Sequence, residues 1–195
     1  MKYDIIAIGT SAGGIDALKS IFATFICKDE VAIIIVQHLA ANSKSYMTHI
    51  ISRLTKMKVY EIEDKMTIKK GCVYIVPPNY HALIEKNGTF TLAIFEKVSF
   101  ARPSIDVTFE SVSDVFGEKS IGVILTGANH DGANGLKFIK DSGGYTLVQN
   151  YMEAEASEMP RYAGEYVKPN EILDIELIGN RLNQLIREME IINVE

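Results

Sequence analysis

Short aliphatic runs alternate with amphipathic segments from the start of the chain. Residues 3–8 and 31–36 have the length and β-branched content of buried strands, and residues 14–25 between them place apolar side chains at helical spacing. Two buried strands joined by a helix are typical of a parallel sheet. The pattern therefore predicts a strand–helix–strand unit at the N-terminal end.

The same alternation returns after one interruption. We expect further helices at residues 43–54, 104–116, 132–140 and 178–189, and further strands at 59–63, 71–76, 121–125, 145–149 and 172–175. Residues 81–95 instead alternate apolar and polar positions on both sides of Asn87-Gly88, a favoured two-residue turn pair. The predicted fold class is α/β: a three-layer, doubly wound, mostly parallel sheet with an antiparallel hairpin insertion near residues 81–95.

Length and composition favour one globular domain over residues 1–195. The chain has 195 residues, of which 47% are hydrophobic, and it shows no internal repeat, low-complexity stretch or linker. That content suffices for one substantial core. Met1 precedes the first predicted strand by two residues, so we expect a free-standing domain or a shortened chain.

Charge, hydropathy and cysteine content exclude several classes of protein. The net charge is −5 and the basic residues are scattered, so we expect no nucleic-acid partner. The longest apolar run is too short to span a bilayer and no signal peptide precedes the first strand, which predicts a cytoplasmic protein without membrane insertion. Cys27 and Cys72 lie far apart without metal-ligand spacing, so we expect two buried thiols and no metal site.

Three side chains follow predicted strands at one edge of the sheet: Ser11, His38 and Asp131. In open parallel sheets this carboxyl edge holds the functional crevice. Residues 9–13 match G-x-S-x-G, in which a tight turn exposes a nucleophilic serine. The same residues could supply a serine helix cap or a glycine-rich phosphate loop. The glycine spacing does not fit G-x-G-x-x-G or a P-loop, so dinucleotide binding takes second place.

His38 is the candidate base for Ser11. A neutral imidazole beside a serine hydroxyl can take its proton, although a histidine at a strand end can also simply satisfy loop carbonyls. His49 lies in a predicted helix and His81 opens the hairpin, so both are expected to be surface or packing residues. His130 is the serious competitor.

Asp131 has two interpretations of similar weight. It could cap the helix predicted from Gly132, or its carboxylate could accept from the imidazole and fix the tautomer. The second interpretation makes His130 a neighbour that points elsewhere. The order Ser, His, Asp excludes an α/β-hydrolase, where the order is Ser, acid, His.

With these segments in place, the sequence resembles the catalytic domain of the chemotaxis protein-glutamate methylesterases (CheB type), without their receiver domain. The resemblance spans nearly the whole chain and rests on the segments "IGTSAGG", "IVQHLA", "GCVYIVPPNYH", "RPSIDVTFESV", "VILTGANHDGANGL", "GGYTLVQN" and "AEASEMPR". It implies Ser11 as nucleophile, His38 as general base and Asp131 as orienting acid. It also implies methyl-accepting chemotaxis receptors as protein substrates, with a separate receiver or methyltransferase protein as a further candidate partner.

The implied reaction is hydrolysis of glutamate methyl esters, with deamidation of glutamines as a second reaction. No metal or organic cofactor is required, and we expect backbone N–H groups near Ala12, Gly13 and Ala128 to hold the oxyanion. Ala12 and Ala128 depart from the threonine and methionine that the family often carries there. Two alternatives stay open: a nucleotide- or phosphate-binding module, and a catalytically impaired member of the same fold.

Overall fold

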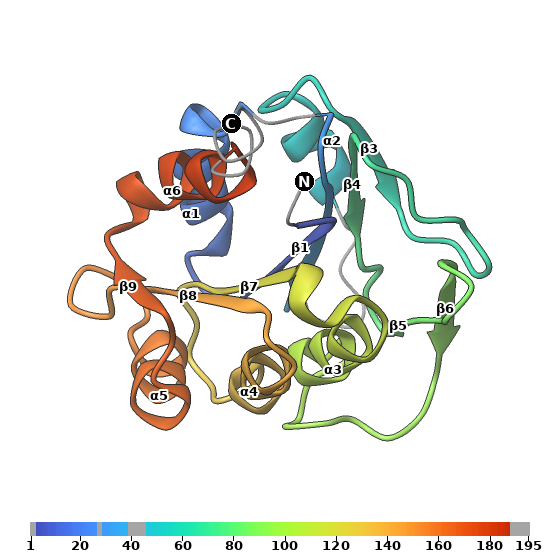
Figure 1. Cartoon of the computed structure of the whole chain (residues 1–195). Coiled ribbons are helices and arrows are strands. Elements are labelled where there is room, and N and C mark those ends of the chain that lie inside the picture. Colours follow the sequence, from blue (N-terminus) through green and yellow to red (C-terminus); the bar gives the residue numbers. More distant parts are fainter. Residues whose placement is uncertain (1–2, 27–28, 39–45, 188–195) are drawn as a thin grey trace.

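A seven-stranded parallel sheet forms the centre of the molecule (Figure 1). The computed structural model describes residues 3–26, 29–38 and 46–187. The strand order β3-β4-β2-β1-β7-β8-β9 reverses direction beside β1, as in doubly wound folds, and confirms the predicted fold class. The strands are β1 (Ile5–Thr10), β2 (Ala32–Gln37), β3 (Lys58–Glu61), β4 (Cys72–Ile75), β7 (Ser120–Ile124), β8 (Tyr145–Gln149) and β9 (Glu171–Leu173).

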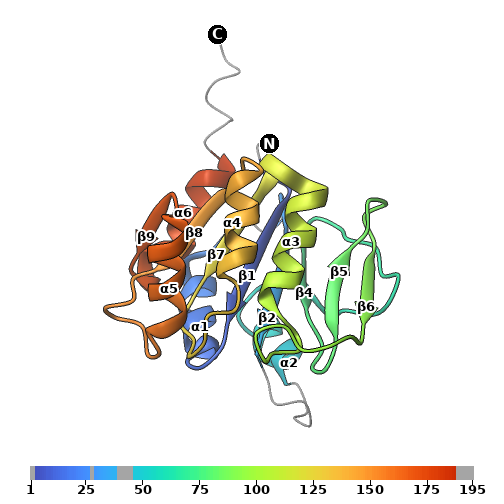
Figure 2. The same ribbon diagram turned by 90° about the horizontal axis from the view of Figure 1, so that it is seen from below.

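Helices cover both faces of this sheet (Figures 1 and 2). On one face lie α1 (Gly14–Thr24), α2 (Met47–Ser52) and α6 (Ile175–Arg187); on the other lie α3 (Ile105–Phe116), α4 (Ala133–Asp141) and α5 (Glu158–Val167). Alternation along β1 explains the two cores, because Ile6 and Ile8 pack on the first face and Ile5 and Ala7 on the second. A short 3-10 helix (Gly117–Lys119) leads from α3 into β7.

The hairpin of β5 (His81–Ile84) and β6 (Phe90–Ala93) is antiparallel, as predicted, and packs beside α3 (Figure 2). Its turn differs from the two-residue turn that we expected. Glu85 pairs with Thr89, and the Gly88 N–H donates to the Glu85 carbonyl, so the loop has three residues. A type I′ turn needs positive φ at both central residues; here Gly88 has φ +77° and Asn87 does not have a positive φ.

Most predicted elements occur within a few residues of their expected ends, but α5 was not predicted. The expected helix starts at residues 43–45 and the expected end at residues 188–189 lie outside the described residues, as does Cys27. Cys72 is a buried free thiol. Within the described ranges, no helix combines the length and the apolar character needed to cross a membrane.

Candidate active site

Ser11 and His38 leave the sheet side by side. Thr10 of β1 pairs with Gln37 of β2, and Ser11 and His38 are the residues that follow them. The His38 N–H donates to the Thr10 carbonyl oxygen over 3.0 Å, which extends the ladder past the strand ends. Because neighbouring parallel strands lie about 4.8 Å apart, the two residues begin as neighbours.

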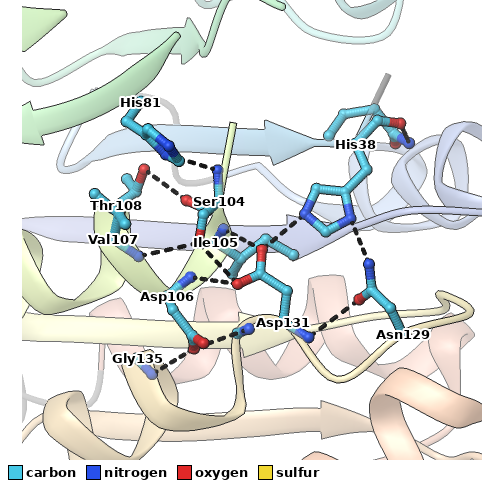
Figure 3. A network of polar contacts seen from close by, with 12 residues as sticks. His38, His81, Ser104, Ile105, Asp106, Val107, Thr108, Asn129, Asp131 and Gly135 are labelled. Atoms are coloured by element: carbon cyan, nitrogen blue, oxygen red, sulfur yellow. Dashed lines mark hydrogen bonds and ion pairs between the residues drawn. The ribbon is translucent and has the colours of Figure 1, made fainter. Parts of the chain in front are cut away.

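Asp131 lies opposite His38 (Figure 3). Its Oδ2 is 2.8 Å from Nε2 of the imidazole, and its side chain is fully buried whereas that of His38 is 11% exposed. Two of the three predicted site residues are thus in direct contact.

The Asp131 carboxylate also accepts hydrogen bonds from the start of α3, not from the helix that follows it in sequence. The backbone N–H groups of Ile105 and Asp106 donate to it over 2.6 and 3.2 Å, and the Ser104 hydroxyl donates over 2.8 Å. The residue at the start of α4 is Gly132, without a side-chain cap. The interpretation of Asp131 as the cap of the helix that follows it is therefore wrong: its carboxylate instead accepts from the N–H groups that follow Ser104, the N-cap residue of α3.

Asp106 of α3 makes the reciprocal contact with the start of α4. Its Oδ1 accepts from the Gly132 and Gly135 N–H groups at the start of α4, over 2.9 and 2.8 Å. Burial, with a further contribution from the nearby Asp131 carboxylate, raises the pKa of Asp106 to about 6, against the opposing hydrogen bond from Gly135. Two helix ends are thus each held by an acid from another segment.

His81 supports the same network from the hairpin. It is fully buried, and its Nδ1 accepts from the Ser104 N–H over 3.3 Å (Figure 3). Its Nε2 lies 3.2 Å from the Glu96 carbonyl oxygen. Burial lowers the pKa of His81, which favours the neutral ring that the hydrogen bond accepted at Nδ1 requires. Of the two expectations for this residue, packing rather than surface exposure is correct.

Asn129 is a contact of His38 that the sequence analysis missed. Its Nδ2 lies 3.1 Å from Nδ1 of the imidazole, and its Oδ1 accepts from the Asp131 N–H over 3.1 Å (Figure 3). An asparagine two residues before an aspartate in a glycine-rich loop is typical of such a turn, so a sequence signal existed. Both ring nitrogens of His38 are therefore engaged.

The loop that carries Ser11 is held through its backbone. The Ser11 N–H donates to the Thr126 carbonyl oxygen over 3.0 Å, and Gln37 Nε2 donates to the Ser11 carbonyl oxygen over 2.7 Å. Gly127 lies so close that an added Cβ would come 3.0 Å from the Ser11 Cβ. Gln37 and Gly127 are further residues that the sequence analysis did not single out.

Free donors adjoin Ser11. Among the described residues, neither the Ala12 N–H nor the Gly13 N–H donates a hydrogen bond within the protein. Gly13 precedes α1 with φ +75°, a conformation that glycine adopts without strain. These two N–H groups at a helix N-terminus can stabilise negative charge on a ligand. Ala128 lies on a different loop, where it lines a cleft.

That cleft opens beside the network. It has a volume of about 540 Å³ and is lined by Ser99, Phe100, Ala128, Asn129, His130 and Glu158. Phe100 is 97% exposed. Asn129 belongs to the cleft wall and also contacts His38, so one residue separates the cleft from the imidazole.

The remaining histidines lie elsewhere. His130 stacks on Tyr162 with ring centroids 4.2 Å apart and contacts Glu158 at 2.9 Å. His49 is exposed on α2. In the part of the chain that the structure describes, no three acidic, cysteine or histidine side chains cluster as metal ligands would.

Comparisons with known proteins find relatives that match nearly the whole chain. Residues 6–182 match the family described as CheB methylesterase. A Leptospira interrogans protein, provisionally named a protein-glutamate methylesterase/protein-glutamine glutaminase, is 49% identical over 187 residues, which are 94% of this chain and 97% of that protein. The protein-glutamate methylesterase/protein-glutamine glutaminase of Maricaulis maris is 33% identical over 90% of this chain, and its Sulfurimonas denitrificans counterpart is 34% identical over 89%.

The chain spans about half the length of those last two relatives, 45% and 51% respectively. The crystal structure of the Thermotoga maritima CheB methylesterase catalytic domain superposes with a TM-score of 0.86 at 28% identity. That match covers 95% of this chain and 100% of the other.

Proposed function

Because the chain belongs to the CheB methylesterase family, we propose that it hydrolyses glutamate methyl esters of chemoreceptor proteins, with Ser11 as nucleophile, His38 as general base and Asp131 as orienting carboxylate. The observation that carries the proposal is the 2.8 Å contact between His38 Nε2 and the buried Asp131 carboxylate, next to Ser11 at the carboxyl edge of the sheet. A buried carboxylate against one ring nitrogen leaves the other as the base.

The ring orientation decides which nitrogen does the chemistry. Nε2 faces Asp131, so Nδ1 takes the Ser11 proton; serine proteases use the two nitrogens the other way round. The Ser11 oxygen attacks the ester carbonyl carbon to form a tetrahedral intermediate. As this collapses, the imidazolium returns the proton to the departing methoxide and methanol leaves. Water, deprotonated by His38, then attacks the acyl-enzyme; the bond to the Ser11 oxygen breaks, the imidazolium returns the proton to that oxygen, and the glutamate carboxylate is restored.

The free backbone N–H groups beside Ser11 stabilise the oxyanion of the intermediate. The N–H groups of Ala12 and Gly13 point from the N-terminus of α1, and backbone donors are unaffected by the alanine at position 12. The exposed Ala128 methyl group lies at the cleft, where a substrate side chain would pass. The same groups would serve glutamine deamidation, in which ammonia leaves instead of methanol. Receptor substrates of this kind place the reaction in the cytoplasm.

The negative charge of Glu155 argues against the phosphate-binding alternative. An added Cβ on Gly13 would lie 2.8 Å from Oε2 of Glu155, so a carboxylate adjoins the glycine loop. A phosphate dianion bound at the same helix end would be repelled by this charge from the start, whereas an ester substrate binds as a neutral group and develops negative charge only in the intermediate.

Replacement of Ser11 tests the proposal. Ser11→Ala should lower methanol release from a methylated receptor, and turnover of an activated ester, by at least about a thousandfold. The melting temperature should stay within about 1 °C, because among the described residues the Ser11 hydroxyl has no hydrogen-bond partner. Activity should remain intact in Ser20→Ala, a matched serine on α1 whose hydroxyl bonds only its own helix.

Residues that share one chemical step fail together. His38→Ala should therefore lose nearly as much rate as Ser11→Ala, and the double variant should be no slower than either. Wild-type turnover in Ser11→Ala would remove the nucleophile from this position.

A further inference from the structure

The nitrogen of His38 that the proposed mechanism needs is occupied. Asn129 Nδ2 lies 3.1 Å from His38 Nδ1, within hydrogen-bond distance. Ser11, the residue that should deliver its proton to Nδ1, makes no side-chain hydrogen bond to any described residue. The Asn129 amide and the Ser11 hydroxyl therefore compete for the same lone pair, that of His38 Nδ1.

The Asn129 amide has one allowed orientation. Its Oδ1 accepts from the Asp131 N–H over 3.1 Å, and exchanging the amide oxygen and nitrogen would set two donors against each other. The NH₂ group thus points at His38, and because an amide NH₂ only donates, Nδ1 must be the acceptor. The neutral imidazole then carries its proton on Nε2 and donates to Asp131.

The contacts close into a ring that begins and ends at Asp131. The Asp131 N–H donates to Asn129, Asn129 donates to His38, and His38 donates to the Asp131 carboxylate (Figure 3). Every donor in this ring meets an acceptor. The ring is satisfied only with neutral His38 in the Nε2–H tautomer.

We propose that Asn129 is a positioning residue that holds His38 in this tautomer and occupies Nδ1 until the Ser11 hydroxyl replaces it. The competition with Ser11 rests on the proposed function, whereas the control of the His38 tautomer does not. The cleft lined by Asn129 supplies the room into which the amide turns when Nδ1 is released.

Protonation of His38 breaks the ring. An imidazolium would direct its Nδ1–H at the Asn129 NH₂ group, and two donors repel. Asn129 therefore favours the neutral base and opposes the imidazolium that forms during attack. The other titratable groups of the network are Asp131 against Nε2, with Asp106 and His81 next to Asp131. Asn129 bonds the backbone N–H of Asp131 but none of these three side chains.

Titration of the His38 ring by ¹⁵N NMR tests the contact without any need for activity. Histidine-labelled protein gives the ring signals, and His38→Gln identifies those of His38. In Asn129→Ala the midpoint should move to higher pH by roughly half to one unit, because a net hydrogen bond of ordinary strength to the neutral form is lost. Asn129→Asp, which offers acceptors to the imidazolium, should move it further.

Asn150→Ala is the matched control. Asn150 forms the same turn, with its Oδ1 accepting from the Met152 N–H over 3.1 Å, but its Nδ2 donates to Asp174 instead of a histidine. Its replacement should leave the His38 midpoint unchanged. An equal midpoint in wild type, Asn129→Ala and Asn150→Ala would overturn the contact.

Labelling of Ser11 by a fluorophosphonate tests the competition. At a pH where His38 is neutral in all variants, Asn129→Ala should be labelled about three to ten times faster than wild type, the factor expected from removal of one competing hydrogen bond. A shifted midpoint with unchanged or slower labelling would mean that Asn129 binds His38 without excluding Ser11, and would overturn the competition. Failure of Ser11→Ala to lose esterase activity would remove the proposed function but leave the NMR result standing.

Discussion

At the scale of single residues, Asp131 is the point where structure and chemistry meet. Its two carboxylate oxygens accept from four donors: the His38 ring, the Ser104 hydroxyl and two backbone N–H groups at the start of α3. A carboxylate accepts in all directions, whereas an amide accepts at one atom and donates at the other. Any substitution of Asp131 therefore affects both the orientation of the imidazole and the hydrogen bonds at the start of α3.

Asp131→Asn should damage both activity and stability. The NH₂ group of the new asparagine must face a donor, either His38 Nε2–H or the N–H groups at the start of α3. A buried clash of two donors costs about 2 to 4 kcal/mol. We expect a loss of at least about a hundredfold in kcat/KM and a melting temperature lower by several degrees. Esterase assays and thermal unfolding of the same preparation measure the two effects.

His130→Ala is the comparison. His130 is exposed and contacts Glu158 and Tyr162, so its loss should change the rate less than about threefold. Should His130→Ala prove the more damaging substitution, His38 would not be the base.

At the residue scale, the sequence could predict positions that strand ends define, but not the contacts that loops make. Ser11 and His38 follow residues of adjacent strands, so their proximity is a consequence of the sheet. The contacts of Asp131 with Ser104 join residues 27 positions apart, through the approach of α3 to the β7–α4 loop. Asn129 depends on side-chain orientation in that loop. Neither follows from hydrophobic periodicity.

At the scale of elements, α3 and α4 exchange caps. Asp131, just before α4, accepts from the N-terminus of α3, while Asp106 of α3 accepts from two N–H groups at the N-terminus of α4. Negative charge at a helix N-terminus is stabilising. The exchange locks the two helices in one register, and Gly135 permits it, since an added Cβ would come 2.6 Å from the Phe109 side chain.

Ser104→Ala should weaken this junction. The Ser104 hydroxyl accepts from the Val107 N–H and donates to Asp131, so the variant loses a helix cap and one donor to the carboxylate. We expect unfolding to cost about 1 to 2 kcal/mol less, together with a reduced esterase rate. Denaturant unfolding with the ester assay measures both.

Ser157→Ala serves as its matched control. Ser157 stands at the start of α5 but caps it with no side-chain hydrogen bond. Its replacement should cost less than about 0.5 kcal/mol. Equal losses for the two serines would show that Ser104 acts only through helix propensity.

The same elements show what periodicity can and cannot supply. Strands buried on both faces, such as β1 and β2, appear in the sequence as aliphatic runs, and amphipathic α3 begins near its expected start. Helix α5 was missed because Pro160 and Gly164 interrupt its pattern; Pro160 lies in the first turn, where proline is tolerated. The hairpin loop was mistyped because Asn-Gly also fits a three-residue loop with glycine last.

At the scale of the whole molecule, the sheet order assembles the site. The strand order places β1 between β2 and β7, so the loops after these three strands, which carry Ser11, His38 and Asp131, converge at one edge (Figure 2). Alternating strands and helices predicted this edge from sequence. The order of the outer strands and the packing of the hairpin against α3 arise from long-range contacts, which local pattern does not encode.

The buried Asp106 carboxyl group at this edge should make the stability of the molecule depend on pH. The folded-state pKa of Asp106, about 6, lies above its ordinary value because of burial, with a further contribution from Asp131. Between these values the folded state holds a proton that the unfolded state releases, so the Asp106 contribution to stability is full at low pH and is lost as pH rises towards and through about 6. Asp106→Asn, which cannot titrate, removes this dependence.

The free energy of unfolding of wild type and Asp106→Asn, measured from pH 4 to 8, tests this. Wild type should lose up to roughly 2 to 3 kcal/mol relative to the variant as pH rises over this range, the equivalent of about two pKa units. Asp114→Asn, an exposed aspartate on the same helix, should show no such trend. In Asp131→Asn the wild-type trend should persist with a lower midpoint, because burial still acts on Asp106 while the neighbouring charge is gone. A stability difference that grew in the opposite direction would mean that the hydrogen bonds from α4 outweigh burial and keep Asp106 ionised.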